Sequence, residues 1–350
     1  MVVNSLPSPL HVDATIEALN SGFHVLSEKP LAKKVSDVDR ILAAEQESGK
    51  TFFPFQQNRL QPFFFKMQEI IASGVLGEIV HIRSSWSSYQ RRWDWQTRQD
   101  LWGGSLLNTG PHAVDQALCL FGWDRTPEIF CRMDSRHAAM GVGDGDAENH
   151  CTVCMYDPER KAPQIDIDIS SFMPGGTAGF GHAEGSGSGA GGVGDTYIVS
   201  GTLGHLRASA RTVTWRYFDP ESAPDHDMWL WSGGEDHPEE RVYPREDLEW
   251  IEEQWDVDQE KLKNAVGYTL ESLQEGQERL YNNVHDVLTN GAERLIQPWQ
   301  SRKQVAVMEE CHRASQRPRC PRLSANPPAF GTALACIPLC LSSPNKPKCL

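Results

Sequence analysis

Residues 24–32 read HVLSEKPLA, and this stretch decides the fold class. It starts with a short apolar run that we interpret as a buried strand, and Glu28-Lys29-Pro30 follows that strand at once. On its N-terminal side the sequence predicts a helix, with Ser8 as the N-cap, Pro9 at the first helical position and Gly22 as the stop. The stretch is therefore expected to follow a helix and to form the second strand of the chain.

Strands and helices alternate on both sides of this stretch. A second helix is predicted from Ser36 to about Glu47, and further strands are predicted at residues 1–3 and 51–55. A β-α-β-α-β order is typical of the parallel, doubly wound sheet of an α/β domain. The Rossmann design for dinucleotides uses two such halves. We therefore expect a partial Rossmann domain over residues 1–58.

The pattern changes after Arg59. Short segments between residues 78 and 218 alternate like half-buried strands, and helices are predicted at residues 62–73, 106–121, 269–289 and 301–314. Runs of strands with helices at the ends favour an α+β domain on an open, mostly antiparallel sheet. We expect this second domain over residues 59–315, with loops at residues 174–194 and in the acidic stretch up to about residue 259.

The last segment, residues 316–350, has a different composition. It holds five basic residues and no acidic ones, and it has neither a helical nor a strand period. We interpret it as a disordered or aberrant basic tail.

Composition excludes several function classes. With 39% hydrophobic and 23% charged residues, the 350-residue chain can build a sizeable core. A net charge of −14 argues against binding nucleic acid, and no apolar run approaches the roughly 20 residues of a membrane span. The first twenty residues show no secretory signal, and nine scattered cysteines indicate reduced thiols. We expect a cytoplasmic protein.

Two short motifs are weak. Gly187, Gly189 and Gly192 spell G-x-G-x-x-G, but a strand rather than a helix is predicted after them, so we interpret the segment as a loop. Cys151 and Cys154 spell C-x-x-C on a predicted strand, where residues three apart point to opposite faces. We expect two buried thiols there rather than a zinc or redox site.

Two other segments suit chemistry better. Glu28-Lys29-Pro30 comes directly after a strand, at the sheet edge where α/β folds bind ligands, although a surface turn with an exposed lysine is the alternative. Asn108 and His112 share a helix face if the helix has begun before Gly110-Pro111, and Asp115 is placed to orient the His112 ring. A capped core helix with one satisfied histidine is the alternative for that segment.

Together these segments resemble the Gfo/Idh/MocA family, named after glucose-fructose oxidoreductase, inositol dehydrogenase and a rhizopine-catabolism protein. LPSPLH at residues 6–11 is similar to the family's T-P-x-x-x-H turn, and residues 18–32 match its A-L-x-x-G-x-H-V-x-x-E-K-P-L-A run. Further similar segments are Asn58-Arg59, GVLGEI at residues 74–79, residues 103–115 and GTLG at residues 201–204.

The resemblance implies an oxidoreductase that uses NAD or NADP and acts on a sugar, an inositol or a related polyol or keto compound. It implies that Lys29, His112 and Asn108 are the catalytic residues. It also implies a small-molecule substrate and a homo-oligomer. The residues implied to line the nicotinamide end of the cofactor are Pro7, His11, Glu28, Lys29 and Pro30.

The chain departs from the family pattern in two ways. Many members have Asp where this chain has Asn108, and an amide cannot relay a proton. The family's opening strand, glycine-rich turn and ribose-binding acidic residue precede the T-P-x-x-x-H turn, and this sequence begins at the fourth strand. We therefore expect an N-terminally truncated gene model of an enzyme. The alternative is a non-catalytic remnant that oligomerises or binds a ligand.

An aromatic and charged loop lies between these motifs. In the enzyme hypothesis Asp94, Trp95 and Arg98 of this loop close over the substrate, together with Arg92. Asp115 is expected to bind the substrate as well. A weaker alternative is a carbohydrate-binding sheet whose aromatic side chains stack on sugar faces. Those side chains are Trp86, Tyr89, Trp93, Trp95 and Trp102, and we favour core and loop packing for them.

Overall fold

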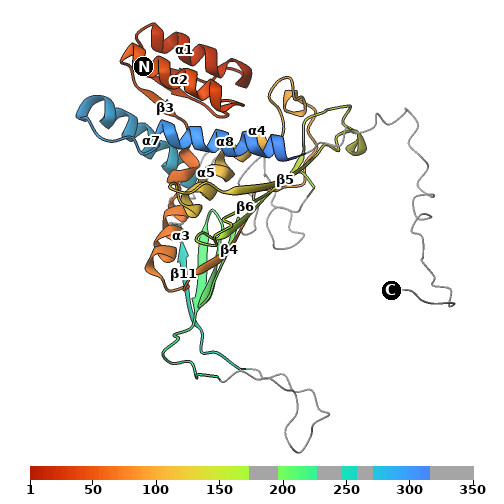
Figure 1. The fold of residues 1–350 in the computed structure, drawn as a ribbon, viewed down its shortest axis with the longest axis vertical. Helices are drawn as coiled ribbons and strands as arrows, with labels where there is room; N and C mark the ends of the chain where they lie inside the picture. The colour runs from red at the N-terminus through yellow and green to blue at the C-terminus, as the bar shows by residue number, and fades with distance from the viewer. Residues whose placement is uncertain (173–195, 227–245, 258–270, 316–350) are drawn as a thin grey trace, which may run out of the picture. The chain divides into compact units, whose positions relative to one another are not determined.

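The fold is described by a computed structural model, which covers residues 1–172, 196–226, 246–257 and 271–315. The strands of these residues form two sheets, one of three strands and one of eight (Figure 1). The expectations for residues 174–194, for the G-x-G-x-x-G motif and for the tail at 316–350 lie outside the described residues.

The first sheet is parallel, with strand order β1-β2-β3. Strands β2 (Val25–Ser27) and β3 (Phe52–Pro54) are buried throughout, whereas β1 (Val2–Asn4) is partly exposed. Helices α1 (His11–Asn20) and α2 (Val35–Ser48) connect them and pack against each other. The predicted β-α-β-α-β pattern is confirmed, since short apolar runs suit strands that helices cover.

The start of the first helix differs from the prediction. A 3-10 turn, η1 (Ser8–Leu10), comes first with Pro7 at its N-cap, and α1 begins at His11. Ser8 is therefore the first residue of the turn and not the N-cap, and no side-chain capping hydrogen bond is made at the N-cap. Two prolines in four residues remove backbone donors, which suits a tight turn before the regular helix.

The second sheet has the order β11-β10-β9-β8-β4-β7-β6-β5. Only the β4–β7 pair is parallel, so the expected open, mostly antiparallel sheet is confirmed. Its strands are β4 (Ile79–Ser85), β5 (Glu128–Asp134), β6 (His150–Tyr156), β7 (Gln164–Ser170), β8 (Tyr197–Gly201), β9 (Gly204–Ala208), β10 (Thr212–Tyr217) and β11 (Ile251–Asp256).

Strand β11 corrects the prediction of a loop in the acidic stretch. Its residues are mostly exposed, and it pairs with β10 over six residues as an edge strand. An edge strand is held by backbone hydrogen bonds on one side, so its sequence needs no apolar alternation. This is why the pattern of residues 251–256 did not reveal it.

The helices lie close to the predicted positions. Gly110-Pro111 divides one predicted helix into α4 (Ser105–Asn108) and α5 (Gly110–Phe121), as the interruption in the sequence indicates. The remaining helical elements are η2 (Gln57–Leu60), α3 (Pro62–Ser73), η3 (Trp95–Thr97), η4 (Ala138–Met140), α7 (Glu271–Asn290) and α8 (Pro298–Ala314).

Helix α8 is last in sequence and connects both sheets. It contacts α2 and β3 of the first sheet and α5 and β5 of the second (Figure 1). The division at residue 58 stays a prediction. None of the described helices is long and apolar enough to cross a membrane.

One face of the eight-stranded sheet forms the main core. Along β7 the buried residues alternate with half-buried ones, and the buried side chains pack with apolar residues of α3, α5 and α8. Cys151 is buried on β6, as predicted, whereas Cys154 is only half-buried because it lies on the other face of the strand. The described cysteines are free thiols.

This arrangement predicts unequal effects of two similar substitutions. Ile167→Ala on the covered face of β7 should lower the free energy of unfolding by about 2–5 kcal/mol, because Ile167 is fully buried. Ile198→Ala is the control, since Ile198 is half-buried on the other face of β8, and it should cost less than about 1 kcal/mol. Urea unfolding measures both, and equal losses would contradict this assignment of faces.

Candidate active site

The loops after β1 and β2 meet at the carboxyl edge of the parallel sheet. The Glu28 backbone N–H donates to the Asn4 carbonyl over 2.9 Å. The His11 ring joins the same two loops, with Nδ1 2.9 Å from the Pro30 carbonyl oxygen and Nε2 2.7 Å from the Leu6 carbonyl oxygen. The Glu28-Lys29-Pro30 turn is therefore held in place by the turn that precedes α1.

Lys29 extends from this edge to the second sheet's helices. Its Nζ donates to the backbone carbonyl of Asn108 over 2.9 Å and lies 3.4 Å from the Asn108 side-chain oxygen. Burial lowers the Lys29 pKa, Glu28 opposes that shift and Arg92 adds to it. Burial likewise raises the Glu28 pKa. The ammonium is thus easier to deprotonate than an exposed lysine.

His112 lies in the first turn of α5. It is 8% exposed, and its ring stacks on Trp86 with centroids 6.4 Å apart and planes at 26°. Its Nδ1 is buried and makes no hydrogen bond within the described part of the chain. Burial, followed by the nearby Lys29 charge, puts the His112 pKa well below its usual value. The imidazole is neutral at pH 7 and can accept a proton.

Asp115 does not orient this ring, which corrects the prediction from spacing. Its two carboxylate oxygens accept from Arg59, from Nε over 2.8 Å and from a terminal nitrogen over 2.5 Å. The buried guanidinium of Arg59 needs a counter-charge, and the carboxylate matches its fork. Asp115 is 1% exposed and does not line the cavity described next.

Lys29, Asn108 and His112 line one cavity of about 350 Å³. Elements of both sheets form its wall, so residues far apart in sequence meet there. The wall is rich in amide and hydroxyl groups, and its other lining residues are Gln57, Asn58, Trp86, Ser88, Gln90, Arg92, Gln96, Gly104, Ser105, Thr109, His137, Glu148, Asn149, Ile169, Ser170 and Ser171.

The aromatic loop contributes only one of the four residues predicted for it, Arg92, together with Gln96. Arg92 and Gln96 line the cavity, whereas Asp94, Trp95 and Arg98 are exposed and are not among its described lining residues. Asp94 caps η3 through the Gln96 N–H and pairs with Arg92, and Arg98 pairs with Asp100. Asp94 and Arg98 therefore form ion pairs with neighbours in the loop and do not face the cavity.

Several lining residues escaped the sequence analysis. Glu148 is 4% exposed, and its carboxylate accepts the Leu106 N–H over 3.0 Å at the start of α4. A Cβ at Gly104 would lie 2.3 Å from that carboxylate, and Gly104 has a φ of 112°, so both requirements favour glycine. Two consecutive polar residues, Glu148 and Asn149, directly before a strand could have indicated a site in the sequence. No sequence pattern indicated His137.

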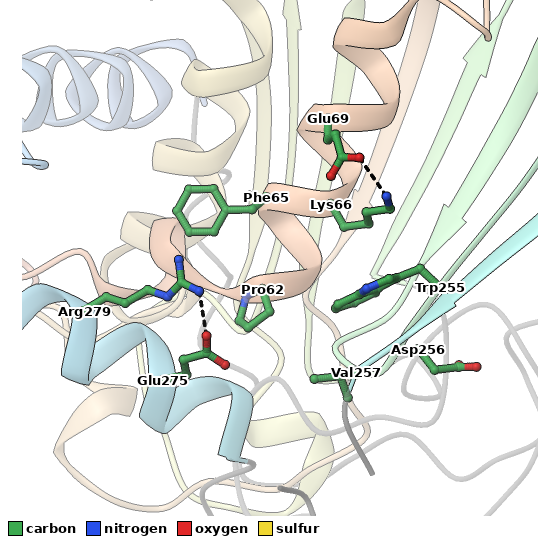
Figure 2. A pocket seen from close by; sticks show the side chains of 9 residues that line it. All are labelled: Pro62, Phe65, Lys66, Glu69, Trp255, Asp256, Val257, Glu275 and Arg279. Carbon is green, nitrogen blue, oxygen red and sulfur yellow. Dashed lines mark hydrogen bonds and ion pairs between the residues drawn. The ribbon is translucent and has the colours of Figure 1, made fainter. Parts of the chain in front are cut away.

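A second hollow lies between α3, β11 and α7 (Figure 2). It is larger, at about 450 Å³, but four of its charged side chains form ion pairs: Lys66 with Glu69 over 2.8 Å, and Arg279 with Glu275 over 2.6 Å. The carboxylate of Asp256 accepts hydrogen bonds from Thr212 and Gln254. Its described lining includes none of the buried polar atoms that lack a partner. The cavity at Lys29 and His112 is therefore the better candidate active site.

The first 56 residues match the family model described as an oxidoreductase family with an NAD-binding Rossmann fold. Residues 64–207 match the model of the GFO/IDH/MocA C-terminal domain. Fold and matches together define the class of protein, a member of an oxidoreductase family with an NAD-binding Rossmann segment. Within that class, the chain belongs to the Gfo/Idh/MocA family, and its cofactor is NAD or NADP.

Curated relatives are similar to this chain over only part of their own length. An uncharacterized oxidoreductase of Schizosaccharomyces pombe is 31% identical over 124 residues, which are 35% of this chain and 34% of that protein. The scyllo-inositol 2-dehydrogenase (NADP(+)) of Bacillus subtilis is 27% identical over 35% of each chain. The chain thus spans about a third of the length of these curated relatives.

Solved structures support the fold. An oxidoreductase from Agrobacterium radiobacter, in complex with NAD+, L-tartaric acid and magnesium, has a TM-score of 0.62 at 16% identity. The alignment covers 90% of this chain and 77% of that one. A probable oxidoreductase, yhhX, gives the same TM-score at 17% identity over 90% of this chain and 78% of that one.

The His112 pKa predicts how stability depends on pH. The folded pKa lies well below the unfolded value of 6.5, so below that pH the unfolded chain binds a proton that the folded protein does not. Stability should therefore fall as pH drops from 7.5 to 5.5. His112→Gln should lose less stability over that range, by about 1 kcal/mol, as urea unfolding measures. The other histidines serve as internal controls, and equal losses in both proteins would contradict the low pKa.

Proposed function

We propose that this protein transfers a hydride between NAD or NADP and the CH–OH carbon of a sugar, an inositol or a related polyol, or the matching keto carbon. One observation carries the proposal. Lys29 comes from the parallel sheet and His112 from a helix of the other domain, and both line one cavity, where Lys29 contacts Asn108. A buried lysine and a neutral histidine in one polar cavity suit proton handling at a carbinol.

The residues at the carboxyl edge of the parallel sheet fit the reacting end of the cofactor. The Ser27 hydroxyl at the end of β2 and the Gln57 side-chain oxygen after β3 are buried without a hydrogen-bond partner in the described residues. Pro7, Glu28 and Pro30 lie in the loops of this edge, and His11 fixes those loops. When bound, the nicotinamide ring supplies the hydride acceptor or donor.

Lys29 would stabilise the substrate oxygen. Its Nζ donates to the two Asn108 oxygens, which orient the group and leave a third N–H for a ligand. As the hydroxyl loses its proton, negative charge develops on the oxygen, and a nearby ammonium stabilises that charge strongly in a buried site. Asn108 cannot titrate, so its role would be to hold Lys29.

His112 would take the proton of the hydroxyl. Its ring is neutral because burial and the Lys29 charge disfavour the imidazolium. Stacking on Trp86 fixes the ring plane, and the Trp86 indole N–H in turn donates to the Ser84 hydroxyl over 2.9 Å. In the reverse direction the same ring would return the proton to the carbonyl oxygen.

The cavity wall supports a polyhydroxylated substrate. Amide side chains and serine hydroxyls can each donate and accept, as sugar hydroxyls require. Similar proteins are named for such compounds, scyllo-inositol in Bacillus subtilis and 2,7-anhydro-N-acetylneuraminate in Escherichia coli. In the enzyme proposed here, Asp94, Trp95 and Arg98 would reach substrate only if their loop moved.

The partners and location follow from the same proposal. We propose a cytoplasmic enzyme with a small-molecule substrate, acting as a homo-oligomer through the uncovered face of the eight-stranded sheet. Exposed Phe130 on β5 lies on that face, which supports an interface there. A non-catalytic family member that only binds a ligand is the second candidate, and the first experiment separates the two.

We expect purified protein to bind NADH or NADPH saturably, measured by fluorescence titration, because the edge residues around Lys29 are in place. Turnover of a polyol panel should then follow at 340 nm with the preferred cofactor. Binding without turnover on any polyol or keto compound would favour the non-catalytic candidate. A folded protein that binds neither cofactor would contradict the proposal.

Two single variants should separate the roles of the catalytic groups. Lys29→Ala should abolish turnover while cofactor affinity stays within a few-fold, because Lys29 acts on the substrate oxygen. His112→Ala should reduce the rate by about 10²–10⁴, the range for a general acid-base group. Arg98→Ala is the control, since Arg98 is exposed and lies outside the cavity wall. If Lys29→Ala turned over substrate at a rate comparable to that of the unmodified protein, the role proposed for Lys29 would be contradicted.

A further inference from the structure

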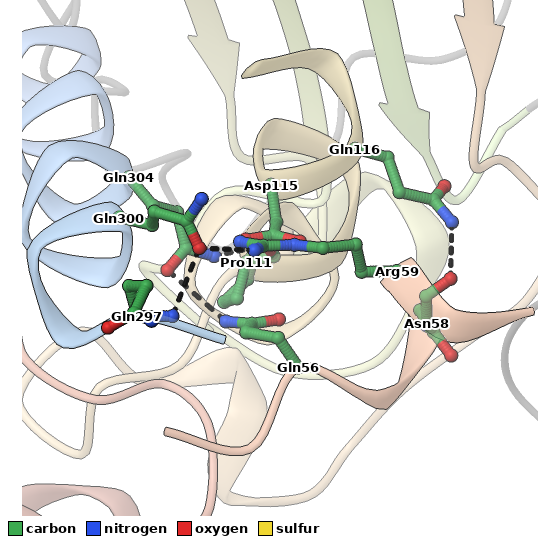
Figure 3. A network of polar contacts seen from close by, with 9 residues as sticks. All are labelled: Gln56, Asn58, Arg59, Pro111, Asp115, Gln116, Gln297, Gln300 and Gln304. Atoms are coloured by element: carbon green, nitrogen blue, oxygen red, sulfur yellow. Dashed lines mark hydrogen bonds and ion pairs between the residues drawn. The ribbon is translucent and has the colours of Figure 1, made fainter. Parts of the chain in front are cut away.

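A buried polar cluster lies between α5, the helix that carries His112, and α8 (Figure 3). We define it by Gln56, Arg59, Asp115, Gln300 and Gln304, which come from the end of the first sheet, from α5 and from α8. Its side chains point toward one another in a small volume between these elements. The cluster is outside the cavity, and the chemistry proposed above does not use it.

Arg59 is the centre of this cluster. Its Nε and one terminal nitrogen bind both oxygens of Asp115, and its other terminal nitrogen donates to the Gln300 side-chain oxygen over 2.5 Å. The guanidinium also lies over the Trp123 ring, 4.8 Å from its centroid. The side chains of Arg59 and Asp115 are 9% and 1% exposed, so water does not screen the pair.

Further bonds connect the cluster to residues next to the active site. Gln304 donates to the carbonyl of Pro111, which directly precedes His112, and accepts from Gln56 over 3.2 Å. On the other side of the helix, Gln116 donates to the Asn58 carbonyl over 2.6 Å. Residues 56–59, which follow β3, are thus bound directly to α5 after His112, at Asp115 and Gln116, and are connected to Pro111, before His112, through Gln304.

This geometry relates the two catalytic groups. Lys29 follows β2, which pairs with β3, and β3 leads directly into residues 56–59. His112 lies between Pro111 and Asp115 on α5. The cluster is therefore a short polar connection between the element that holds Lys29 and the element that holds His112.

We propose that Arg59 and Asp115 are positioning residues, whose bidentate pair sets the register of α5 and thereby keeps His112 beside Lys29 in the cavity. The inference rests on the proposed function. A buried ion pair is a poor source of stability, because desolvation offsets its attraction, and apolar residues of similar volume often replace such a pair without loss. Its fixed directions, however, define one arrangement of the two elements, which apolar contacts do not.

The test is the double variant Arg59→Met with Asp115→Leu, which removes both charges and keeps the volume. We expect a folded protein with a Tm within about 5 °C of the unmodified protein. Its kcat should fall roughly 10- to 100-fold with KM nearly unchanged, because the groups stay present but lose alignment. The pKa of His112, followed by NMR of its ring, should rise as Lys29 moves away.

A matched control uses another ion pair between α8 and the first sheet's helices. Arg302 binds Asp39 over 2.5 and 3.1 Å, but both side chains are about half exposed and do not contact α5. Arg302→Gln with Asp39→Asn should leave kcat and the His112 pKa unchanged. The same fall in kcat in this control would overturn the inference, because it would mean that kcat depends on the docking of α8 in general and not on the Arg59–Asp115 pair.

Two results would overturn the inference. The first is a double variant with the kcat and the His112 pKa of the unmodified protein. If the double variant does not fold, Arg59→Lys decides, since it keeps the charge but loses the fork, and unchanged values there overturn the inference equally. Should the unmodified protein lack turnover, the proposed function fails, and the His112 pKa alone still tests the positioning role.

Discussion

A guanidinium without a counter-charge is very unfavourable in a protein interior, and the position of Arg59 depends on this constraint. Its side chain is fully enclosed, and Asp115 is the carboxylate that meets it. Arg59 follows the last strand of the parallel sheet, whereas Asp115 lies on α5. The ion pair that neutralises Arg59 therefore also holds α5 against the end of that sheet. Gln300 and Gln304 extend the same docking to α8. The cavity, with one catalytic candidate on each side, exists because these elements meet here.

The same principle of burial determines the chemistry of the cavity. Lys29 and His112 are both removed from water, which disfavours their charged forms, and the charge of Lys29 lowers the His112 pKa further. A reaction at a carbinol needs a proton acceptor at neutral pH and a cation beside the oxygen. The environment fits both proposed roles, since Lys29 keeps hydrogen bonds to Asn108 while no carboxylate among the described residues stabilises the His112 imidazolium.

Local patterns in the sequence indicated most elements of the fold. The alternation around residues 24–32, the break at Gly110-Pro111 and the strands of the second sheet other than β11 were found, because periodicity, caps and turn residues act over a few positions. The errors have equally local causes. Strand β11 lacks a pattern because it is an exposed edge, and the spacing of His112 and Asp115 indicated a contact that the charge of Arg59 prevents.

The sequence by itself determined the family motifs, the α/β and α+β order and the candidates Lys29, Asn108 and His112. Only the tertiary structure decided which side chains meet. Lys29 contacts Asn108 across 79 positions, and Arg59 contacts Gln300 across 241. Contacts of that kind depend on strand order and on how α5 and α8 pack between two sheets. No local pattern encodes them, because each requires the whole arrangement to bring two distant segments within hydrogen-bonding distance.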